Sequence, residues 1–451
     1  MDQSSSIAPA MPASIEDTGL SAKFLSSLLL KTVHMLGFET SVELAGQLKL
    51  SQVVVDQLLN HLKQQGLVEV RGSVAATVPV LRYALTAAGK DMAIQACRQC
   101  EYVGPAPVTL SSYQSQVNQQ SITREKVTMA SLSAGLSHLV LSPQLVRRLG
   151  PAVNSGRAML VYGPPGNGKT SISEAIGKVF HQCIYVPYCI EVDGQVIRIF
   201  DPTVHEEITP ARVPHSIDGE GVNLLRKKSD PRWVKCRRPV VVMGGELTLE
   251  MLDLEYDPTS KFYEAPPQVK ALGGVFIIDD FGRQLVQPRD LLNRWIVPLE
   301  RRVDYLTIHT GKKFDLPFDE LVIFSTNISP TKLMDPALLR RVKYKLRVDP
   351  PSHGDYVTIF RRVCRQHELE LPEQVLSYLV EDFYPRTRTP FAAFHPIFIV
   401  EHALATCKYE NRAPHLTLDL VKDALENLYV SDFQERDLAT PLEALLQAKV
   451  S

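Results

Sequence analysis

The sequence has few cysteines, no cysteine framework and no long apolar run. Seven cysteines are scattered over 451 residues, an odd number that favours free thiols in a reducing compartment over structural disulfides. Cys97 and Cys100 form a CxxC, but no second cysteine pair or histidine pair lies at zinc spacing, so we expect two thiols at a helix end. No apolar stretch approaches the ~20 residues of a membrane-spanning helix, so no membrane span is expected.

An excess of charge of one sign is also missing. The formal net charge is −1, which leaves no overall field to attract nucleic acid or an anionic membrane. The first residues, MDQSSSIAPAMPASIEDTG, contain neither a basic nor an apolar segment, so we expect no secretory signal and a cytoplasmic location. The sequence contains no HExxH and no Ser/His/Asp arrangement, so a built-in protease is not expected.

The N-terminal part of the chain divides by composition. Residues 1–19 are rich in Ser, Ala and Pro and are expected to be disordered. Residues 20–97 have the element order of a winged helix, in which the third helix is capped by Ser51 and ends at Gly66. The expected helices and strands are 24–35, 41–48, 51–66, 67–71, 80–85 and a helix from 86. Residues 98–130 are rich in Gln and Ser and are expected to be a linker.

The expected winged helix has few features of a DNA-binding module. Residues 20–97 contain seven basic and five acidic residues, and the helix that would read bases begins SQVVVDQ, without Arg or Lys. Phosphate binding needs several well-placed cations. A protein-docking or regulatory role is therefore favoured, with DNA binding as the alternative.

A phosphate-binding motif starts at Gly163. The run GPPGNGKT matches GxxxxGK[ST], follows the apolar run 158–162 and precedes a sequence compatible with a helix. Lys169 is expected to reach the β- and γ-phosphates of ATP, and the Thr170 hydroxyl is expected to ligate Mg²⁺. The residues expected to bind nucleotide are Gly163, Pro164, Pro165, Gly166, Asn167, Gly168, Lys169, Thr170 and Ser171.

Two further motifs supply groups that ATP hydrolysis needs. GGVFIIDDFG is an apolar strand that ends in Asp279, expected to hold Mg²⁺, and Asp280, expected to polarise the attacking water. The side chain of Asp280 is one methylene shorter than that of glutamate, so we expect its carboxylate to lie farther from the attacking water. This predicts slow hydrolysis of ATP. DELVIFSTN is a second buried strand, and its Asn327 is expected to hydrogen-bond the water and the γ-phosphate.

With MDPALLRRVKYKLRVDPPS, these motifs make residues 131–430 resemble an AAA+ ATPase. The resemblance implies an α/β fold with a parallel sheet, flanking helices and a C-terminal helical lid, preceded by the α+β winged helix. VPLERRVDYLTIHTGKKFDLPFDELVIFSTN resembles the β-hairpin that MoxR-like ATPases insert before this strand. More narrowly, GGVFIIDDFGRQ, LTIHTGKKFDLPFD and ALLRRVKYKLRVDPP resemble bacterial chaperone-like ATPases associated with Flp-type pilus assembly.

The resemblance also implies a ring, expected to be a homohexamer. In such rings Arg340 or Arg341 would reach the ATP of a neighbouring subunit. Relatives carry a sensor arginine at the start of the third lid helix, where this chain has Ile397. Either this sensor is missing, or Arg386 or Arg388 replaces it.

The loop before GGVFIIDDFG contains candidate residues for contact with a substrate. In ring translocases this loop faces the pore, and the candidate residues are Lys261, Phe262 and Tyr263. The alternative is that the two aromatic residues pack in the core. The basic run LLRKKSDPRWVKCRRP is expected to be a solvated surface, with a partner contact as its alternative.

The predicted function is an ATP-hydrolysing ring motor that remodels or translocates an unidentified protein client. The alternative is a DNA-associated ATPase or transcription regulator. The expected boundaries are 1–19 for the tail, 20–97 for the winged helix, 98–130 for the linker, 131–348 for the α/β core with an insertion at 181–266, and 349–451 for the lid.

Overall fold

The computed structural model describes residues 7–73, 81–208 and 229–429. The expected start of a strand at residue 80 lies outside them, as do residues 1–6, 209–228 and 430–451. The chain forms two compact units. The first comprises Met1–Gly135, Gly150–Leu160 and Ser173–Lys345, and the second comprises Leu136–Leu149, Val161–Ile172 and Leu346–Ser451.

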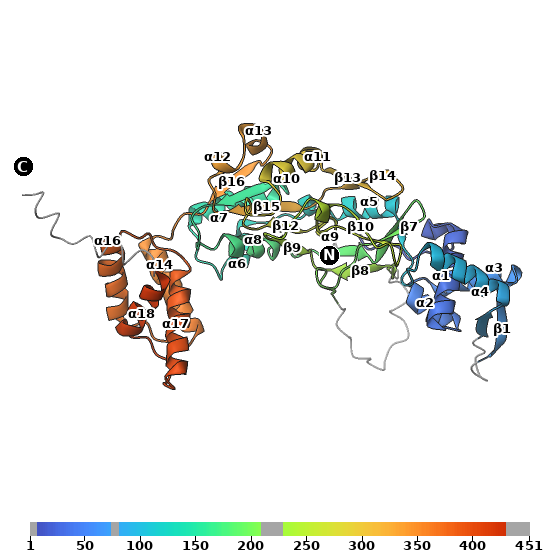
Figure 1. The fold of residues 1–451 in the computed structure, drawn as a ribbon, viewed down its shortest axis with the longest axis horizontal. Coiled ribbons are helices and arrows are strands. Elements are labelled where there is room, and N and C mark those ends of the chain that lie inside the picture. Colours follow the sequence, from blue (N-terminus) through green and yellow to red (C-terminus); the bar gives the residue numbers. More distant parts are fainter. Residues whose placement is uncertain (1–6, 74–80, 209–228, 430–451) are drawn as a thin grey trace, which may run out of the picture. The chain divides into compact units, whose positions relative to one another are not determined.

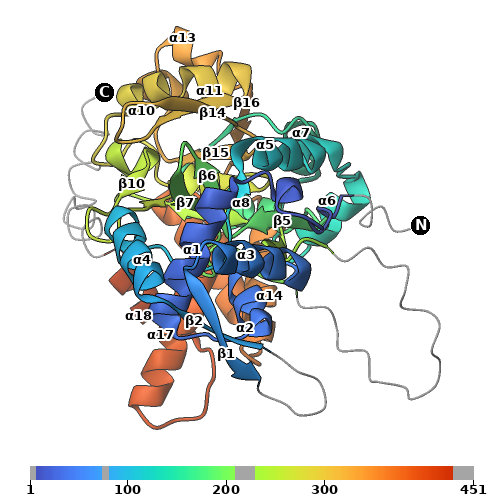
Figure 2. The same ribbon diagram turned by 90° about the vertical axis from the view of Figure 1, so that its right-hand side faces the viewer.

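The N-terminal elements of the first unit follow the predicted order, because each helix starts at a side-chain cap. Ser51 accepts a hydrogen bond from the backbone N–H of Val54, and Thr40 and Glu43 form a reciprocal capping box. The elements are α1 (Ala22–Leu36), α2 (Ser41–Leu48), α3 (Gln52–Gln64), β1 (Val68–Ser73), β2 (Leu81–Leu85) and α4 (Ala87–Gln99), with β1 antiparallel to β2. Figure 2 shows α1, α3 and α4 beside this hairpin.

The segment expected to be a linker is instead part of the fold. It contains β3 (Val108–Thr109), α5 (Leu110–Gln119) and the short helix η3 (Ile122–Arg124). Tyr113 on α5 is buried, and the amide of Gln120 both donates to and accepts from the backbone of Tyr185. The glutamine-rich composition wrongly predicted a linker. A buried glutamine amide can form the hydrogen bonds that a backbone N–H and C=O need, as a neighbouring strand would.

The tail is also ordered where it is described. The backbone oxygen of Pro12 accepts a hydrogen bond from Ser51 Oγ, and that of Ile7 accepts one from Gln116 Nε2. The prediction of disorder is therefore wrong for residues 7–19, which contact side chains far along the chain.

A five-stranded sheet forms the centre of the α/β fold, with the strand order β16-β4-β15-β12-β9. Its strands are β4 (Met159–Tyr162), β9 (Val240–Met243), β12 (Val275–Ile278), β15 (Leu321–Thr326) and β16 (Tyr344–Arg347). β12 pairs in parallel with both β9 and β15, and every residue of β12 and β15 is buried. Such continuous apolar strands are typical of parallel sheets covered by helices on both faces (Figure 1).

Further helices and a hairpin lie before and between these strands. The helices are η2 (Glu16–Thr18) in the tail, then α6 (Met129–Gly135), α7 (Pro143–Asn154), α8 (Lys169–Gly177), η4 (Glu250–Leu252), α9 (Pro267–Lys270), α10 (Pro288–Arg294), α11 (Ile296–Arg301), α12 (Pro330–Leu333) and α13 (Pro336–Leu339). The expected hairpin before β15 is present as antiparallel β13 (Val303–Thr307) and β14 (Lys313–Pro317).

The insertion between α8 and β12 builds a second five-stranded sheet, β10-β11-β7-β6-β3. Its further strands are β6 (Cys189–Val192), β7 (Gln195–Arg198), β10 (Glu255–Tyr256) and β11 (Tyr263–Glu264), and β5 (Ile184–Pro187) pairs separately with β8 (Trp233–Cys236). Asp193 and Gly194 join β6 to β7 with φ values of 55° and 78°, as a type I′ turn requires.

Two arginines of the basic run are buried rather than solvated. Arg232 is 4% exposed and pairs with Asp230, and Arg238 is 6% exposed and pairs with Glu125 at 2.8 Å. Residues 224–228 of the same run lie outside the described residues. Because buried charges need partners, these two arginines have structural roles, and the expectation of a solvated surface is wrong for them.

The candidate pore residues include one core residue. Tyr263 is 1% exposed and stacks with His309, so it follows the core alternative and does not line a channel. Phe262 is partly buried against Tyr102, with 5.6 Å between ring centroids. Lys261 donates to the backbone oxygen of Arg98. β10 and β11 hold this loop as a short antiparallel hairpin.

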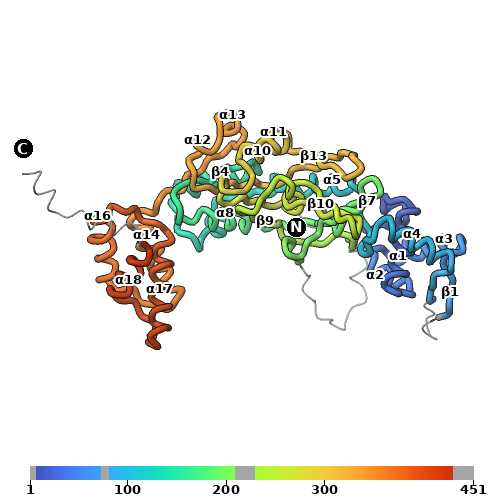
Figure 3. The backbone as a smooth tube through the Cα atoms, viewed as in Figure 1, coloured from blue at the N-terminus to red at the C-terminus, as the bar shows by residue number. Residues whose placement is uncertain are grey.

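The C-terminal residues of the second unit form a small helical bundle. The helices are α14 (His353–Gln366), α15 (Glu373–Ser377), the π-helix η5 (Tyr378–Phe383), α16 (Tyr384–Thr387), α17 (His395–Tyr409) and α18 (Leu418–Leu428). Phe360, Leu379, Val400 and Val421 lie in its core. Figure 3 shows α14, α17 and α18 side by side. In the described ranges, no helix has the length and apolarity to cross a bilayer.

Candidate functional site

The phosphate-binding motif forms a glycine loop between β4 and α8. Gly163, Gly166 and Gly168 have φ values of 153°, 74° and 75°, which only glycine adopts at little cost. Lys169 is the first residue of α8, and its Nζ donates to the Pro164 backbone oxygen at 2.8 Å. Successive N–H groups in such a loop, together with the helix N-terminus, provide a cradle for phosphate.

The two residues that precede α17 hold this loop directly. The Phe394 N–H donates to the Gly166 backbone oxygen at 3.0 Å, and the Ala393 N–H donates to Asn167 Oδ1 at 3.2 Å. Asn167 is only 6% exposed although its position in the motif accepts any residue type. Its side chain thus links the glycine loop to the helical bundle.

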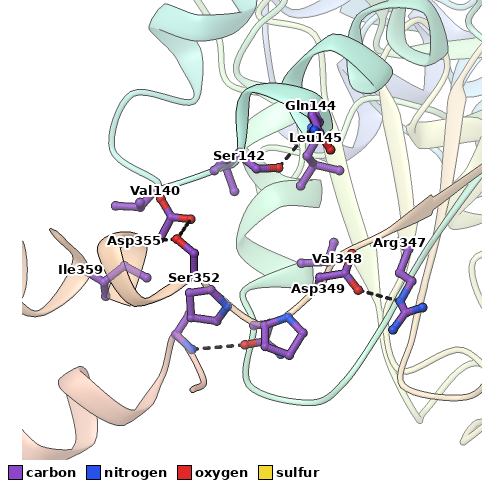
Figure 4. Close-up of a pocket in the computed structure, with 15 residues that line it drawn as sticks. Val140, Ser142, Gln144, Leu145, Arg347, Val348, Asp349, Ser352, Asp355 and Ile359 are labelled. Carbon is purple, nitrogen blue, oxygen red and sulfur yellow. Dashed lines mark hydrogen bonds and ion pairs between the residues drawn. The ribbon is translucent and has the colours of Figure 1, made fainter. Parts of the chain in front are cut away.

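Two cavities adjoin the glycine loop within the second unit. One of about 370 Å³ is lined by the loop residues Gly166–Gly168, by residues 138–141 and by apolar side chains that include Ile359 of α14, Ile397 of α17 and Phe394 just before α17. The other, of about 270 Å³, shares Val140 and Ile359 and extends to the connection between β16 and α14 (Figure 4). Figure 4 shows Ser352 bonded to Asp355, and Arg347 paired with Asp349. An apolar cavity beside a phosphate loop suits a nucleotide base and sugar.

The arginine that reaches the larger cavity is neither of those predicted. Arg388 is exposed and is absent from the lining of both cavities, and Arg386 lies beside Tyr378. Instead, Arg362 of α14 lines the larger cavity and donates to the backbone oxygens of Ser137 and Leu139. The sequence contained no signal for Arg362, since it lies inside an ordinary amphipathic helix.

The acidic motif and its asparagine come together in the first unit. Asn327, which follows β15, donates from Nδ2 to Asp280 Oδ1 at 3.1 Å. Asn327 Oδ1 is buried without a hydrogen-bond partner among the described residues, so the amide retains one acceptor. Asp280 adopts a left-handed conformation, with φ of 46°, which is uncommon outside glycine.

The connection after β12 is fixed by further hydrogen bonds. The Asp279 N–H donates to the Met243 backbone oxygen, and Gln284 Nε2 donates to the Asp279 backbone oxygen. The Phe281 N–H donates to the Ser325 backbone oxygen at 2.7 Å. These bonds hold the two strand ends together and place Asp280 next to Asn327.

The two candidate finger arginines differ in their contacts. Arg341 pairs with Glu300 at 2.7 Å and donates to the Ala337 backbone oxygen. Arg340, at the end of α13, is exposed, and its guanidinium group makes no hydrogen bond or ion pair in the described part of the chain. Only Arg340 is therefore available for another molecule without losing an internal ion pair.

The donor groups of these motifs fit a bound nucleotide. The described ranges contain no group of three His, Cys, Asp or Glu side chains that would hold a metal, and Cys97 and Cys100 are free thiols. By contrast, the open glycine loop and the unpartnered Asn327 Oδ1 suit a phosphate chain and a water molecule, respectively.

A family model described as a domain of unknown function (DUF8689) matches residues 352–427, which is the helical bundle. No curated protein matches the sequence. Similar solved structures include NtrX from Brucella abortus, with 13% identity, coverage of 69% of this chain and 61% of that chain, and a TM-score of 0.42. This chain therefore spans less than two thirds of NtrX.

Two further solved structures come from Thermotoga maritima. A RuvB mutant has 14% identity, 68% and 73% coverage of the two chains, and a TM-score of 0.37. Domain III of the replication initiation protein DnaA has 14% identity, 65% and 95% coverage, and a TM-score of 0.35. At TM-scores below 0.5 these likenesses carry no argument about activity. The functional assignment of this chain therefore depends on its own motifs and geometry.

Proposed function

We propose that the protein is an ATPase of the AAA+ type that works as a homo-oligomeric ring, expected to be a hexamer, on a protein client. The observation that carries the proposal is the hydrogen bond from Asn327 to Asp280, which pairs an amide with a carboxylate beside a retained amide acceptor. Together with GPPGNGKT, this pair supplies the groups that phosphoryl transfer to water requires.

The proposal assigns a role to each motif. Residues 163–171 bind the phosphates, with Lys169 neutralising their charge, and Thr170 and Asp279 hold Mg²⁺. Bound Mg·ATP supplies the phosphoryl group that is transferred. Asp280 accepts a proton from the attacking water, and Asn327 orients that water through Oδ1. The hydrogen bond from Asn327 to Asp280 fixes the orientation of the Asp280 carboxylate before substrate binds.

Arg340 is proposed as the residue that completes the site of a neighbouring subunit. A guanidinium that approaches the γ-phosphate stabilises the charge that develops in the transition state. Arg340 is exposed, whereas Arg341 is paired with Glu300. Of the two candidates for the arginine that reaches the neighbouring subunit's ATP, we therefore propose Arg340.

A protein client is favoured over DNA by the surface of α3. Val53 near the start of this helix is 58% exposed, and the helix carries its one lysine, Lys63, in its last turn. A helix that reads bases needs polar or basic side chains at its N-terminal end. Phe262 and Lys261 remain candidates for contact with a client, whereas Tyr263 does not.

The test uses Asp280→Asn, with Lys169→Ala for comparison. Asp280→Asn keeps the shape of the side chain but removes the proton acceptor, so we expect ATP binding within a few-fold of wild type and turnover lowered at least 100-fold. Lys169→Ala is expected to abolish ATP binding itself. Wild-type turnover in Asp280→Asn would disprove the role of Asp280, and unchanged ATP affinity in Lys169→Ala would disprove the nucleotide site.

A further inference from the structure

Lys31 of α1 is a buried ammonium group with no counter-ion among the described residues. The residue is 6% exposed, and its Nζ donates to the backbone oxygen of Cys100 at 2.7 Å. In the described ranges Lys31 makes no ion pair, and the ionisable groups that face it are the thiols of Cys97 and Cys100. Burial lowers the pKa of Lys31, because the charged form has lost water without gaining an anion.

The same lysine lines a cavity of about 480 Å³ inside the first unit. The walls come from α1, from the end of α4 and from the start of β7, and Figure 2 shows the two helices. Lys23 also lines it, and no Asp or Glu is among the residues that form its wall. A volume of this size lies within the range of ~300–1,000 Å³ typical of small-molecule sites.

We propose that this cavity binds a small organic carboxylate whose anionic group pairs with Lys31. The ammonium has three N–H donors, and one of them is bonded to the backbone oxygen of Cys100. The remaining donors are available for an anion. Phe24, Leu28 and Val196 give the cavity an apolar side for a short hydrocarbon portion. The hydroxyl of Ser27 and the amide of Gln195 provide further neutral hydrogen-bond donors.

The cavity lies between the N-terminal helices and the inserted sheet, so a bound ligand contacts both. Helices α1 and α4 belong to the N-terminal elements, whereas Gln195 and Val196 begin a strand of the inserted sheet. A carboxylate bound to Lys31 therefore stabilises the packing between these two parts of the first unit. The inference does not depend on the proposed ATPase activity.

The experiment measures binding to the full-length chain by calorimetry and thermal shift at constant ionic strength. The probes are sodium butyrate, hexanoate and benzoate, with butyramide and sodium chloride as the neutral and inorganic controls. We expect saturable binding of at least one carboxylate and none of butyramide. Lys31→Met should lower carboxylate affinity at least tenfold, and Lys63→Met, which changes an exposed lysine on α3, should leave it unchanged.

A second variant decides the matter if Lys31→Met does not fold. Gln195→Glu places a carboxylate on the cavity wall, where it supplies the missing counter-charge and should weaken the binding of added carboxylate at least tenfold. The proposal is overturned if none of the three carboxylates binds saturably. It is also overturned if affinity stays within twofold of wild type in the folded variants Lys31→Met or Gln195→Glu.

Discussion

The ring of Phe394 occupies the space beside Gly166 that any larger residue would need. A Cβ on Gly166 would lie 2.1 Å from the nearest ring atom, and the Phe394 N–H bonds to the Gly166 backbone oxygen. Phe394 lies three residues before Ile397, where relatives were expected to place a sensor arginine. In this chain the helical bundle therefore contacts the backbone of the phosphate loop through an aromatic ring.

This relationship predicts a strong coupling between positions 166 and 394. Gly166→Ala should destabilise the ligand-free protein, because the added methyl group collides with Phe394 and alanine is strained at a φ of 74°. In a Phe394→Ala background the collision is absent and only the strain remains. The free energies of unfolding of wild type, the two single variants and the double variant should give a coupling of about 1 kcal/mol or more. The double variant should be destabilised by less than the sum of the two single variants.

Gly168→Ala is the matched control for this cycle. Gly168 has a φ of 75°, so alanine carries the same backbone strain, but no atom of the described residues lies within 4 Å of the added methyl group. The coupling between Gly168→Ala and Phe394→Ala should therefore be close to zero. Equal coupling at both glycines would mean that Phe394 does not pack on Gly166 in solution.

Asn327 is predicted to act in turnover rather than in binding. Asn327→Ala removes the donor to Asp280 and the free acceptor Oδ1, so kcat should fall about 100-fold, as for removal of other positioned polar groups. The affinity for a non-hydrolysable ATP analogue should change less than fivefold. Asn293→Ala on the exposed side of α10 is the control and should leave both quantities unchanged.

The sequence predicted the local parts of the site well for a physical reason. A glycine loop between an apolar strand and a helix, and acids at the end of a buried strand, are encoded within ten to fifteen neighbouring residues. The strands β12 and β15, the bounds of α1 and α2 and the N-cap Ser51 of α3 were therefore predicted nearly correctly.

Contacts between distant residues were not predictable in this way. Arg238 reads as part of a solvated basic run, yet it is buried against Glu125, 113 positions earlier. Gln120 reads as a linker residue but pairs with the backbone of Tyr185. Arg362 and Phe394 line the cavity beside the glycine loop only because the bundle folds back on residues 161–172. No local pattern encodes such partners.

The two arginines after α13 should behave differently in a mixed assembly. Arg340→Ala should retain ATP binding and lose at least 100-fold in turnover, because a subunit's finger serves the neighbouring site. Mixing Arg340→Ala with Lys169→Ala should restore part of the activity, since some interfaces then combine an intact arginine with an intact loop. Arg341→Ala removes the pair with Glu300 and should lower turnover far less. Absence of rescue in confirmed mixed rings would argue against sites shared between subunits.

The helical bundle should lose stability on acidification through His395. This residue is 4% exposed, and burial lowers its pKa from 6.5 to about 4, so it is neutral in the folded state near pH 7. Its ring nitrogens bond to the hydroxyls of Tyr384 and Tyr429. Between pH 6.5 and 4 the unfolded chain binds the proton more readily than the folded one, and the folded state therefore loses about 2 kcal/mol by pH 5 relative to pH 7.

Hydrogen exchange of the α17 amides between pH 7 and pH 5, corrected for the intrinsic exchange rate, measures this loss. His395→Phe cannot be protonated and fills a similar volume, so its α17 amides should show a much smaller change in protection over the same interval. Because His395 directly follows Phe394, this loss of stability should also weaken the contact between Phe394 and Gly166. As the pH is lowered from 7 to 5, ATP affinity should therefore decrease more steeply in wild type than in His395→Phe. Parallel pH profiles of the two proteins would show that another group controls the acid sensitivity of the bundle.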